Sequence, residues 1–149
     1  MNSLKYQDTL LAPGNLKKVN AYFSTQKTNT TGTVHLYLKT GILLTAAALL
    51  YFFLIWGGLS VLAGLALCVV FGFCLAGIGF NVMHDGAHGS YSRKKWINEI
   101  MAYSLNLMGG NSYLWKQKHN VNHHTYTNVE GHDDDINIQP LMRTNINQP

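Results

Sequence analysis

The chain has 149 residues, of which 47% are hydrophobic and only 12% are charged, whereas soluble domains carry about 25% charged residues. The formal net charge is +4, and seven histidines equal the acidic residues in number. This composition excludes a disordered chain and a disulfide-stapled miniprotein, and it argues against a wholly soluble fold.

The first 39 residues carry the whole net positive charge, because five lysines there oppose a single acid, Asp8. These lysines are scattered and form no dense basic face, so binding to nucleic acid is not expected. Apolar residues from Leu16 to Phe23 recur at helical spacing, which predicts either an amphipathic helix on a membrane surface or a solvated arm. The run from Thr25 to Thr33, rich in Thr, Asn and Gly, predicts a loop.

No charged residue and no histidine occurs from Gly41 to Met83. As one helix this stretch would be about 64 Å long, whereas the hydrocarbon core of a bilayer is about 30 Å thick. The sequence Trp56-Gly57-Gly58 favours a turn at the membrane interface, so we expect two spans, roughly Lys39–Ile55 and Leu59–Met83. A buried helical hairpin inside a large soluble protein is the alternative.

A hairpin returns the chain to the side of the membrane on which it began. Lys39 before it and Arg93-Lys94-Lys95 after it therefore share one face, which the positive-inside rule assigns to the cytoplasm. The apolar segment from Trp96 to Gly110 is short for a span and contains Glu99, so it predicts an interfacial helix.

Five of the seven histidines fall in two clusters on this inferred cytoplasmic side. His84 and His88 form H-x-x-x-H directly after the apolar stretch, and His119, His123 and His124 form H-x-x-x-H-H. Residues four apart share one face of an α-helix, so each H-x-x-x-H pair can aim its imidazoles at a common point. His124 would lie about 100° further round the helix, where it could complete the first metal site or serve a second.

The two clusters together predict a metal site, because neutral imidazole is a ligand of zinc, copper, iron and nickel. Surface histidines, or histidines that cap helix ends, are the alternative, but neither explains two clusters. A metal at the cytoplasmic end of a hairpin could reach a lipid chain between helices, and histidine-ligated iron keeps positions open for dioxygen. Hydrolysis and phosphoryl transfer have no candidate residues, because the sequence contains no nucleophile elbow and no P-loop.

Four acidic residues lie close to these clusters in the sequence. Asp85, inside the first cluster, could hydrogen-bond a ligand imidazole or lie on a helix surface. Asp133, Asp134 and Asp135 follow the second cluster and could hold its imidazoles or form a solvated turn.

Residues 84–88 and 119–124 resemble the first two histidine boxes of the membrane fatty acid desaturases. The flanking sequences are similar as well, including Asn81-Val82-Met83 before the first box and Trp115 before the second. The run from His123 to Asn128, followed by Gly131-His132-Asp133-Asp134-Asp135-Ile136, most resembles the branch of front-end, acyl-CoA or acyl-lipid desaturases. The resemblance covers roughly residues 16–140.

The resemblance implies an all-α integral membrane fold, in which two non-haem iron ions and dioxygen form a cis double bond in a fatty acyl chain. The iron ligands would be His84, His88, His119, His123 and His124, on the cytoplasmic side. The substrate would be an acyl-CoA or an acyl-lipid. The chain lacks the His-Pro-Gly-Gly of a fused cytochrome b5 domain, so electrons would come from an external donor of the cytochrome b5 or ferredoxin type, or from a module beyond residue 149.

The family also has a third box, (H/Q)-x-x-H-H, and a second pair of transmembrane helices, and neither occurs in this sequence. Five imidazoles are too few to close the family's di-iron site, so we expect the N-terminal part of a longer enzyme, inactive by itself. The expected parts are a cytoplasmic N-terminal segment (1–39), a two-span hairpin (40–83) and a truncated cytoplasmic histidine-box region (84–149). A membrane di-iron hydroxylase or ketolase is one alternative, and a non-catalytic or truncated membrane metal-binding protein is another.

Overall fold

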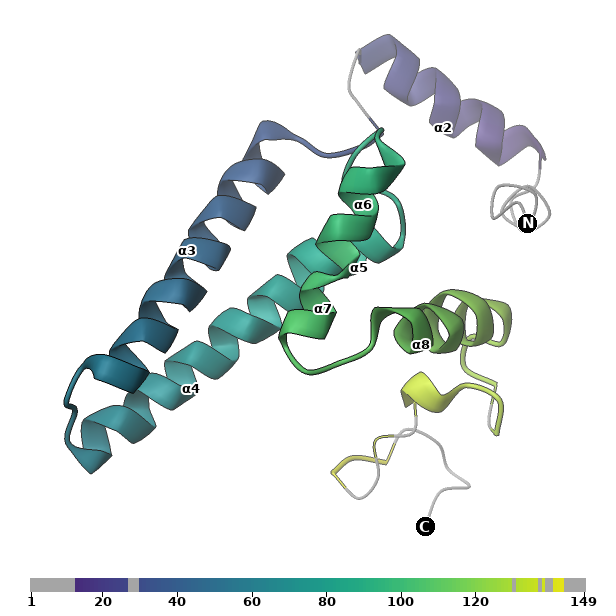
Figure 1. The fold of residues 1–149 in the computed structure, drawn as a ribbon. Coiled ribbons are helices and arrows are strands. Elements are labelled where there is room, and N and C mark those ends of the chain that lie inside the picture. The colour runs from purple at the N-terminus through teal and green to yellow at the C-terminus, as the bar shows by residue number, and fades with distance from the viewer. Residues whose placement is uncertain (1–12, 27–29, 130, 137, 139–140, 144–149) are drawn as a thin grey trace.

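A computed structural model of the chain describes residues 13–26, 30–129, 131–136, 138 and 141–143. Every regular element within these residues is helical, which confirms the predicted all-α fold (Figure 1). In chain order the elements are α2 (Pro13–Gln26), α3 (Val34–Trp56), α4 (Val61–Ile78), the π-helix η1 (Gly79–Met83), α5 (His84–Ala87), α6 (Lys95–Ala102), α7 (Ser104–Leu107), α8 (Ser112–Lys116), the π-helix η2 (Gln117–His123) and the 3-10 helix η3 (Asp134–Ile136).

The first helix of the hairpin, α3, begins at Val34 and not at the predicted Lys39. The side chain of Thr33 caps it by accepting a hydrogen bond from the amide of Leu36 (3.3 Å). Lys39 therefore lies inside the helix, where its ammonium donates to the side-chain oxygen of Asn81 in η1 (2.6 Å). A charge near the end of an apolar helix thus has a polar partner on the neighbouring helix.

The turn of the hairpin confirms the break predicted at Trp56-Gly57-Gly58. The helix α3 ends at Trp56, and Gly58 follows with φ at +57°, a left-handed conformation that favours glycine. Ser60 then caps α4 by accepting a hydrogen bond from the amide of Ala63 (3.4 Å).

The second span and the first histidine box belong to one continuous helix, Val61–Ala87. Within it, Gly79–Met83 are π-helical, and the amide of His84 donates to the carbonyl five residues back. The side chain of Asn81 donates to the carbonyl of Gly77 (2.8 Å). The prediction ends the second span just before the box, whereas the helix continues through most of the box.

Both Val34–Trp56 and Val61–Ala87 are long and apolar enough to cross a membrane. They lie side by side (Figure 1), yet only 6% of the most apolar stretch of each is buried inside the chain. Most apolar side chains of the hairpin therefore face outward, which is unfavourable in water and favourable in lipid hydrocarbon. This is the surface of a transmembrane hairpin.

The core of the chain lies at the end of the hairpin that carries the first box. Ile78, Val82 and Tyr91 are buried there, and Val82 in η1 has no exposed surface. The hydroxyl of Tyr91, in the loop after the box, donates to the hydroxyl oxygen of Thr40 (3.0 Å) and so ties the loop to α3. The side chains packed around this cluster are Leu36, Leu43, Ala47, Leu75, Ile97, Met101 and Met108.

The segment predicted as an interfacial helix, Trp96–Gly110, forms two helices, α6 and α7, that are separated at Tyr103. The helix α6 packs against α5, close to Gly86. Asn98 of α6 is buried and donates to the carbonyl of Gly89 (3.1 Å), which fixes the loop between the two helices. Contact of this segment with a membrane surface stays a prediction.

The helix α2 confirms the helix predicted around Leu16–Phe23. It is largely exposed and stands apart from the other helices (Figure 1), and its binding to a membrane stays a prediction. Of the predicted loop Thr25–Thr33, the first two residues belong to α2 and residues 30–33 are non-helical. Residues 27–29 of this loop, and residues 1–12 and 144–149 of the predicted outer segments, lie outside the described residues.

The packing of α5 on α6 predicts that Gly86 cannot carry a side chain. A Cβ there would lie 2.7 Å from the amide nitrogen of Ala102 and 2.8 Å from the carbonyl oxygen of Asn98, both backbone atoms. We expect Gly86→Ala to lower the free energy of unfolding by about 1–3 kcal/mol, measured by circular dichroism on the chain in detergent micelles. Gly72→Ala is the matched control, because nothing lies within 4 Å of a Cβ at Gly72. Equal effects of the two substitutions would contradict the prediction.

Candidate metal centre

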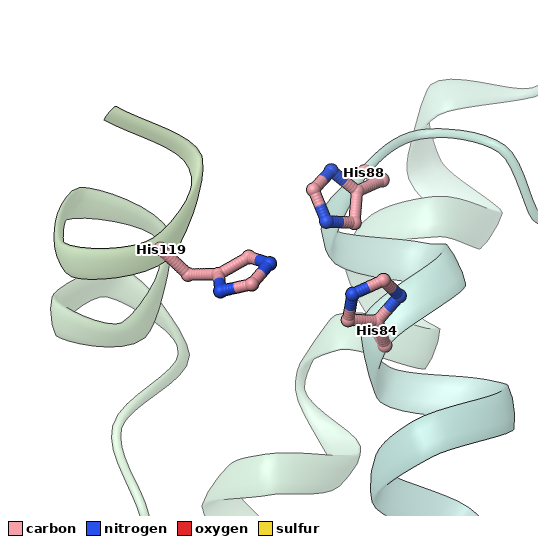
Figure 2. Close-up of side chains that lie close together, drawn as sticks. All are labelled: His84, His88 and His119. Carbon is pink, nitrogen blue, oxygen red and sulfur yellow. The ribbon is translucent and has the colours of Figure 1, made fainter. Parts of the chain in front are cut away.

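The two histidine clusters lie on separate helices whose imidazoles face one another. His84 begins α5 and His88 directly follows it, and their ring centroids are 4.4 Å apart. His119 points toward them from η2, with its ring 5.3 Å from that of His84 and 5.2 Å from that of His88. Figure 2 shows these three rings directed into one space between the helices.

The remaining two imidazoles join the same group. The ring of His123 stacks on that of His119, with centroids 5.0 Å apart and an interplanar angle of 16°. The ring of His124 lies 5.0 Å from that of His88 and 5.1 Å from that of His119. His124 is therefore not turned away as an α-helix would require, because the segment that carries the second cluster is π-helical.

Two groups of side chains in the described part of the chain are close enough to share a metal ion. Within each group, one possible ligand atom per residue lies within 4.8 Å of the others. One group is His84, His88 and His119, and the other is His119, His123 and Asp135. Imidazoles with a carboxylate form a donor set that suits iron or zinc.

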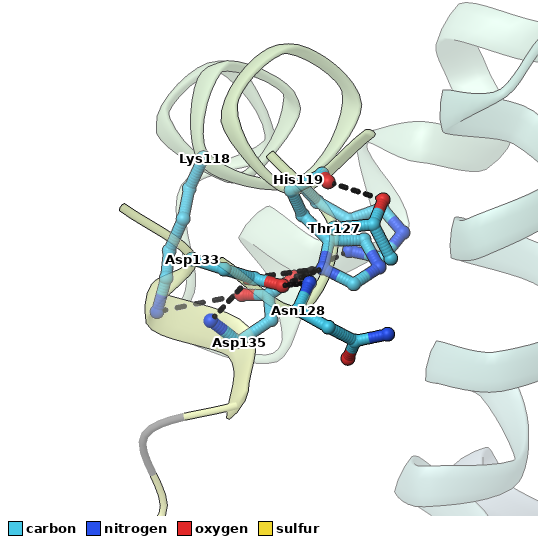
Figure 3. A network of polar contacts seen from close by, with 7 residues as sticks. Lys118, His119, Thr127, Asn128, Asp133 and Asp135 are labelled. Atoms are coloured by element: carbon cyan, nitrogen blue, oxygen red, sulfur yellow. Dashed lines mark hydrogen bonds and ion pairs between the residues drawn. The ribbon is translucent and has the colours of Figure 1, made fainter. Parts of the chain in front are cut away.

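Two of the four predicted aspartates hold the imidazoles of the second cluster (Figure 3). Nδ1 of His119 lies 2.6 Å from a carboxylate oxygen of Asp135. Nδ1 of His123 lies 2.9 Å from both carboxylate oxygens of Asp133. We assign the ring proton to Nδ1 in each case, because a carboxylate only accepts. This tautomer leaves Nε2 of both rings with a lone pair for a metal.

Asp133 is a buried carboxylate with several donors. It accepts hydrogen bonds from the backbone amides of Asn128 (2.8 Å) and Asp135 (3.1 Å) as well as from His123. Burial by itself raises the pKa of Asp133, but the hydrogen bond from His123, followed by those from the two amides, brings the pKa below its ordinary value. Asp135 has a cationic neighbour as well as His119, since Nζ of Lys118 lies 3.6 Å from its carboxylate.

The other two predicted aspartates are placed differently. The carboxylate of Asp85 lies 3.7 Å from Nδ1 of His84, which is too long for a hydrogen bond. The backbone carbonyl of Asp85 instead accepts from the amides of Ser90 (2.9 Å) and Tyr91 (3.2 Å). Asp134 is exposed at the start of η3.

Crowding and burial keep two of the imidazoles neutral. Burial, followed by the neighbouring His84, His124 and His119, lowers the pKa of His88 from 6.5 to about 4. Burial and the neighbouring imidazoles also lower the pKa of His124, although Asp135 opposes this effect. Both rings are therefore unprotonated at neutral pH, which is the state in which imidazole binds a metal.

Asn120 is the residue of this region that the sequence did not single out. Its side-chain amide donates to the carbonyl of Ala87 (2.9 Å), which lies in the last turn of a helix, where carbonyls lack partners within the helix. The second cluster thus caps the helix that carries the first. Oδ1 of Asn120 is buried and has no hydrogen-bond partner among the described residues. An asparagine in a polar run gives no signal of such a contact.

A cavity of about 500 Å³ opens beside the imidazoles. Phe80 and Met83 line it from η1, and His84, Trp115 and His119 line it on the side of the imidazole cluster. The ring of Trp115 stacks on that of His119, with centroids 4.4 Å apart and an interplanar angle of 21°. A largely apolar cavity that reaches possible metal ligands suits an extended apolar substrate.

The sequence matches the family model described as fatty acid desaturase over residues 60–148. It is 39% identical over 127 residues to the sn-1 linoleoyl-lipid 6-desaturase of Arthrospira platensis, and this match covers 85% of this chain and 34% of that protein. It is 36% identical over 135 residues to the acyl-lipid (8-3)-desaturase of Physcomitrium patens, and this match covers 89% of this chain and 28% of that protein. The chain thus spans about a third of the length of these relatives. No solved structure matches the chain.

The hydrogen bonds that Asp135 accepts from His119 and Asp133 accepts from His123 predict that both carboxylates support metal binding without touching the metal. Asp133→Asn or Asp135→Asn should weaken binding of Co²⁺ by about 10–100-fold, because an amide no longer fixes the tautomer of the imidazole. Binding can be followed by the visible absorption of Co²⁺ on the chain in micelles. Asp134→Asn is the matched control and should leave the affinity unchanged. Loss of affinity in this control, or none in the other two variants, would refute the assignment.

The lowered pKa of His88 predicts that the stability of the metal-free chain depends on pH. Between about pH 6.5 and 4, the unfolded state binds a proton at His88 that the folded state does not bind. The free energy of unfolding should therefore fall as the pH is lowered through this window. Unfolding curves with a chelator present, recorded from pH 7.5 to 4.5, should show this loss. The curve of His88→Gln should be flatter, and parallel curves would show that His88 is not the cause.

Proposed function

The chain belongs to the fatty acid desaturase family, and we propose on this basis that it introduces a cis double bond into a fatty acyl chain. Dioxygen would be the oxidant, and non-haem iron the cofactor. The observation that carries the proposal is the convergence of five imidazoles from two segments beside a largely apolar cavity. Because the chain spans about a third of the length of its relatives, the proposal concerns the complete gene product.

We propose His84, His88, His119, His123 and His124 as ligands of iron. The donor set fits iron, since these are imidazoles, and the lowered pKa values of His88 and His124 keep those two rings free of protons. The unpartnered Oδ1 of Asn120 also fits a site that holds a further polar group. His84, His88 and His119 come from both boxes and offer ligand atoms within 4.8 Å of one another. The family resemblance is the support for two ions.

Iron bound there would supply the activation of dioxygen, which side chains do not provide. The reaction takes one hydrogen from each of two adjacent methylenes. The donor supplies two electrons and the solvent two protons, so that one O₂ becomes two waters. The residues of this chain have the task of binding and positioning the substrate. Phe80 and Met83 offer an apolar wall to the methylenes, and the ring of Trp115 lines the same cavity.

The names of the relatives support an acyl chain attached to a lipid as the substrate, because they are linoleoyl-lipid and acyl-lipid desaturases. Such a substrate already lies in the bilayer, where the apolar faces of the hairpin would lie. The two electrons for each turnover would come from an external carrier of the cytochrome b5 or ferredoxin type, for which the family resemblance is the support.

We propose that the histidine boxes face the cytoplasm. Lys39 contacts Asn81, so it lies at the end of the hairpin that carries the first box. Arg93, Lys94 and Lys95 follow this box directly. Positive residues that flank spans at one end favour the cytoplasmic side. The division into an N-terminal segment (1–39), a hairpin (40–83) and a box region (84–149) stays part of this proposal.

The proposal predicts a new double bond when the complete reading frame that encodes the chain is expressed in yeast supplied with linoleic acid. Product lipids would be analysed by gas chromatography with mass spectrometry. His119→Ala should abolish the product, because this imidazole belongs to both groups of donors. His35→Ala is the matched control, since His35 is exposed and lies outside both boxes.

Two results would contradict the proposal. Desaturation that persists in His119→Ala would remove this residue from the ligands. An added oxygen atom in place of a double bond would instead identify a hydroxylase or ketolase.

A further inference from the structure

The second histidine box lies on a π-helix, η2 (Gln117–His123), and not on an α-helix. The amide of His124, directly after it, donates to the carbonyl of His119, five residues back. π-Helices are rare and are mostly single turns at functional sites. The first box is also preceded by a π-turn, η1 (Gly79–Met83).

The π-helix changes which residues share a face. In an α-helix each residue is rotated by about 100°, so His119 and His124 would point about 140° apart. With hydrogen bonds to the fifth residue back, the rotation falls to about 80° per residue. His123 and His124 then flank His119 at about 40° on either side, so that three imidazoles share one face.

The ring positions agree with the π-helical rotation. The centroid of the His119 ring lies 5.0 Å from that of His123 and 5.1 Å from that of His124, and those two lie 5.4 Å apart. His124 also reaches His88 of the first box, at 5.0 Å. The same sequence as an α-helix would turn His124 away from His88 and leave four imidazoles at the site.

We propose that the π-turn is the positioning element of the second box, and that the number of residues in the box is matched to it. This inference rests on the proposed metal-binding role of the histidines. It predicts that the turn contains one residue more than an α-helix would need to gather the same three imidazoles.

Val121 is the residue of the turn to delete as a test. It is 50% exposed, whereas the neighbouring Asn120 makes the hydrogen bond to Ala87. Deletion of Val121 would leave histidines at positions i, i+3 and i+4, which share one face of an α-helix. An α-helical register should therefore replace the π-turn and keep all three imidazoles together.

An insertion has the opposite effect. One alanine added after Val121 would place the second and third histidines of the box five and six residues after His119. In an α-helix these positions lie about 140° and 240° round from the first. In a π-helix the third position lies about 120° round, so neither helix gathers all three imidazoles. Val121→Ala keeps the register and serves as the matched control.

The test is a Co²⁺ titration of the product of the complete reading frame in lipid nanodiscs, with far-ultraviolet circular dichroism to record the fold. The deletion and Val121→Ala should bind Co²⁺ within about threefold of the parent, and the insertion should bind at least about 100-fold more weakly. A deletion variant that loses binding or fails to fold would overturn the inference, and so would an insertion that binds normally. A parent protein that binds no Co²⁺ would instead overturn the proposed function.

Discussion

Hydrogen bonding of the backbone inside a bilayer is the constraint on which this structure depends. Lipid hydrocarbon offers no water, so a spanning segment has to keep its amides and carbonyls bonded within its own helix. The helix Val61–Ala87 meets this requirement while it carries the first histidine box beyond the apolar stretch. It changes rotation at the π-turn Gly79–Met83 without a break, and the side chain of Asn81 reaches the carbonyl of Gly77. An irregular loop in that place would leave backbone groups bare beside the lipid.

The need to satisfy backbone hydrogen bonds also explains how two distant segments form one site. The second box joins the first through a contact between helix ends, because Asn120 in η2 donates to the carbonyl of Ala87. The contact satisfies a carbonyl that the first helix leaves open, and it sets the distance between the two sets of imidazoles. The cavity beside them then follows from the geometry of the first helix, since Phe80 and Met83 of η1 precede His84 by less than two turns.

Local pattern was enough to predict the hairpin, its glycine turn and the two histidine clusters, because each depends on residues close in the sequence. The rotation of the second cluster could not be predicted, since a spacing of four suits α- and π-helices alike. The sequence therefore left open whether His124 completes the first metal site or serves a second, and the π-helix brings its ring beside those of His88 and His119. Proximity in sequence also failed to show which carboxylates hold imidazoles. Asp85 is the immediate neighbour of His84, and adjacent residues on a helix point in different directions, whereas Asp133 and Asp135 reach the second cluster only because the chain folds back.

The two halves of the site are held by different forces. The first box rests on close packing, because Gly86 lets the backbone of α6 approach, and its neighbouring carboxylate stays beyond hydrogen-bond distance of the imidazole. The second box depends on hydrogen bonds to charged groups, because the carboxylates of Asp133 and Asp135 accept from the rings of His123 and His119. Both aspartates lie on a short segment that ends in η3. Close packing is sensitive to the volume of a side chain, whereas carboxylate contacts respond to the protonation of the carboxylate and to the position of the segment that carries it. The imidazoles of the first box are therefore fixed by the membrane helix, whereas the position of those of the second box depends on how the chain after this box docks against it.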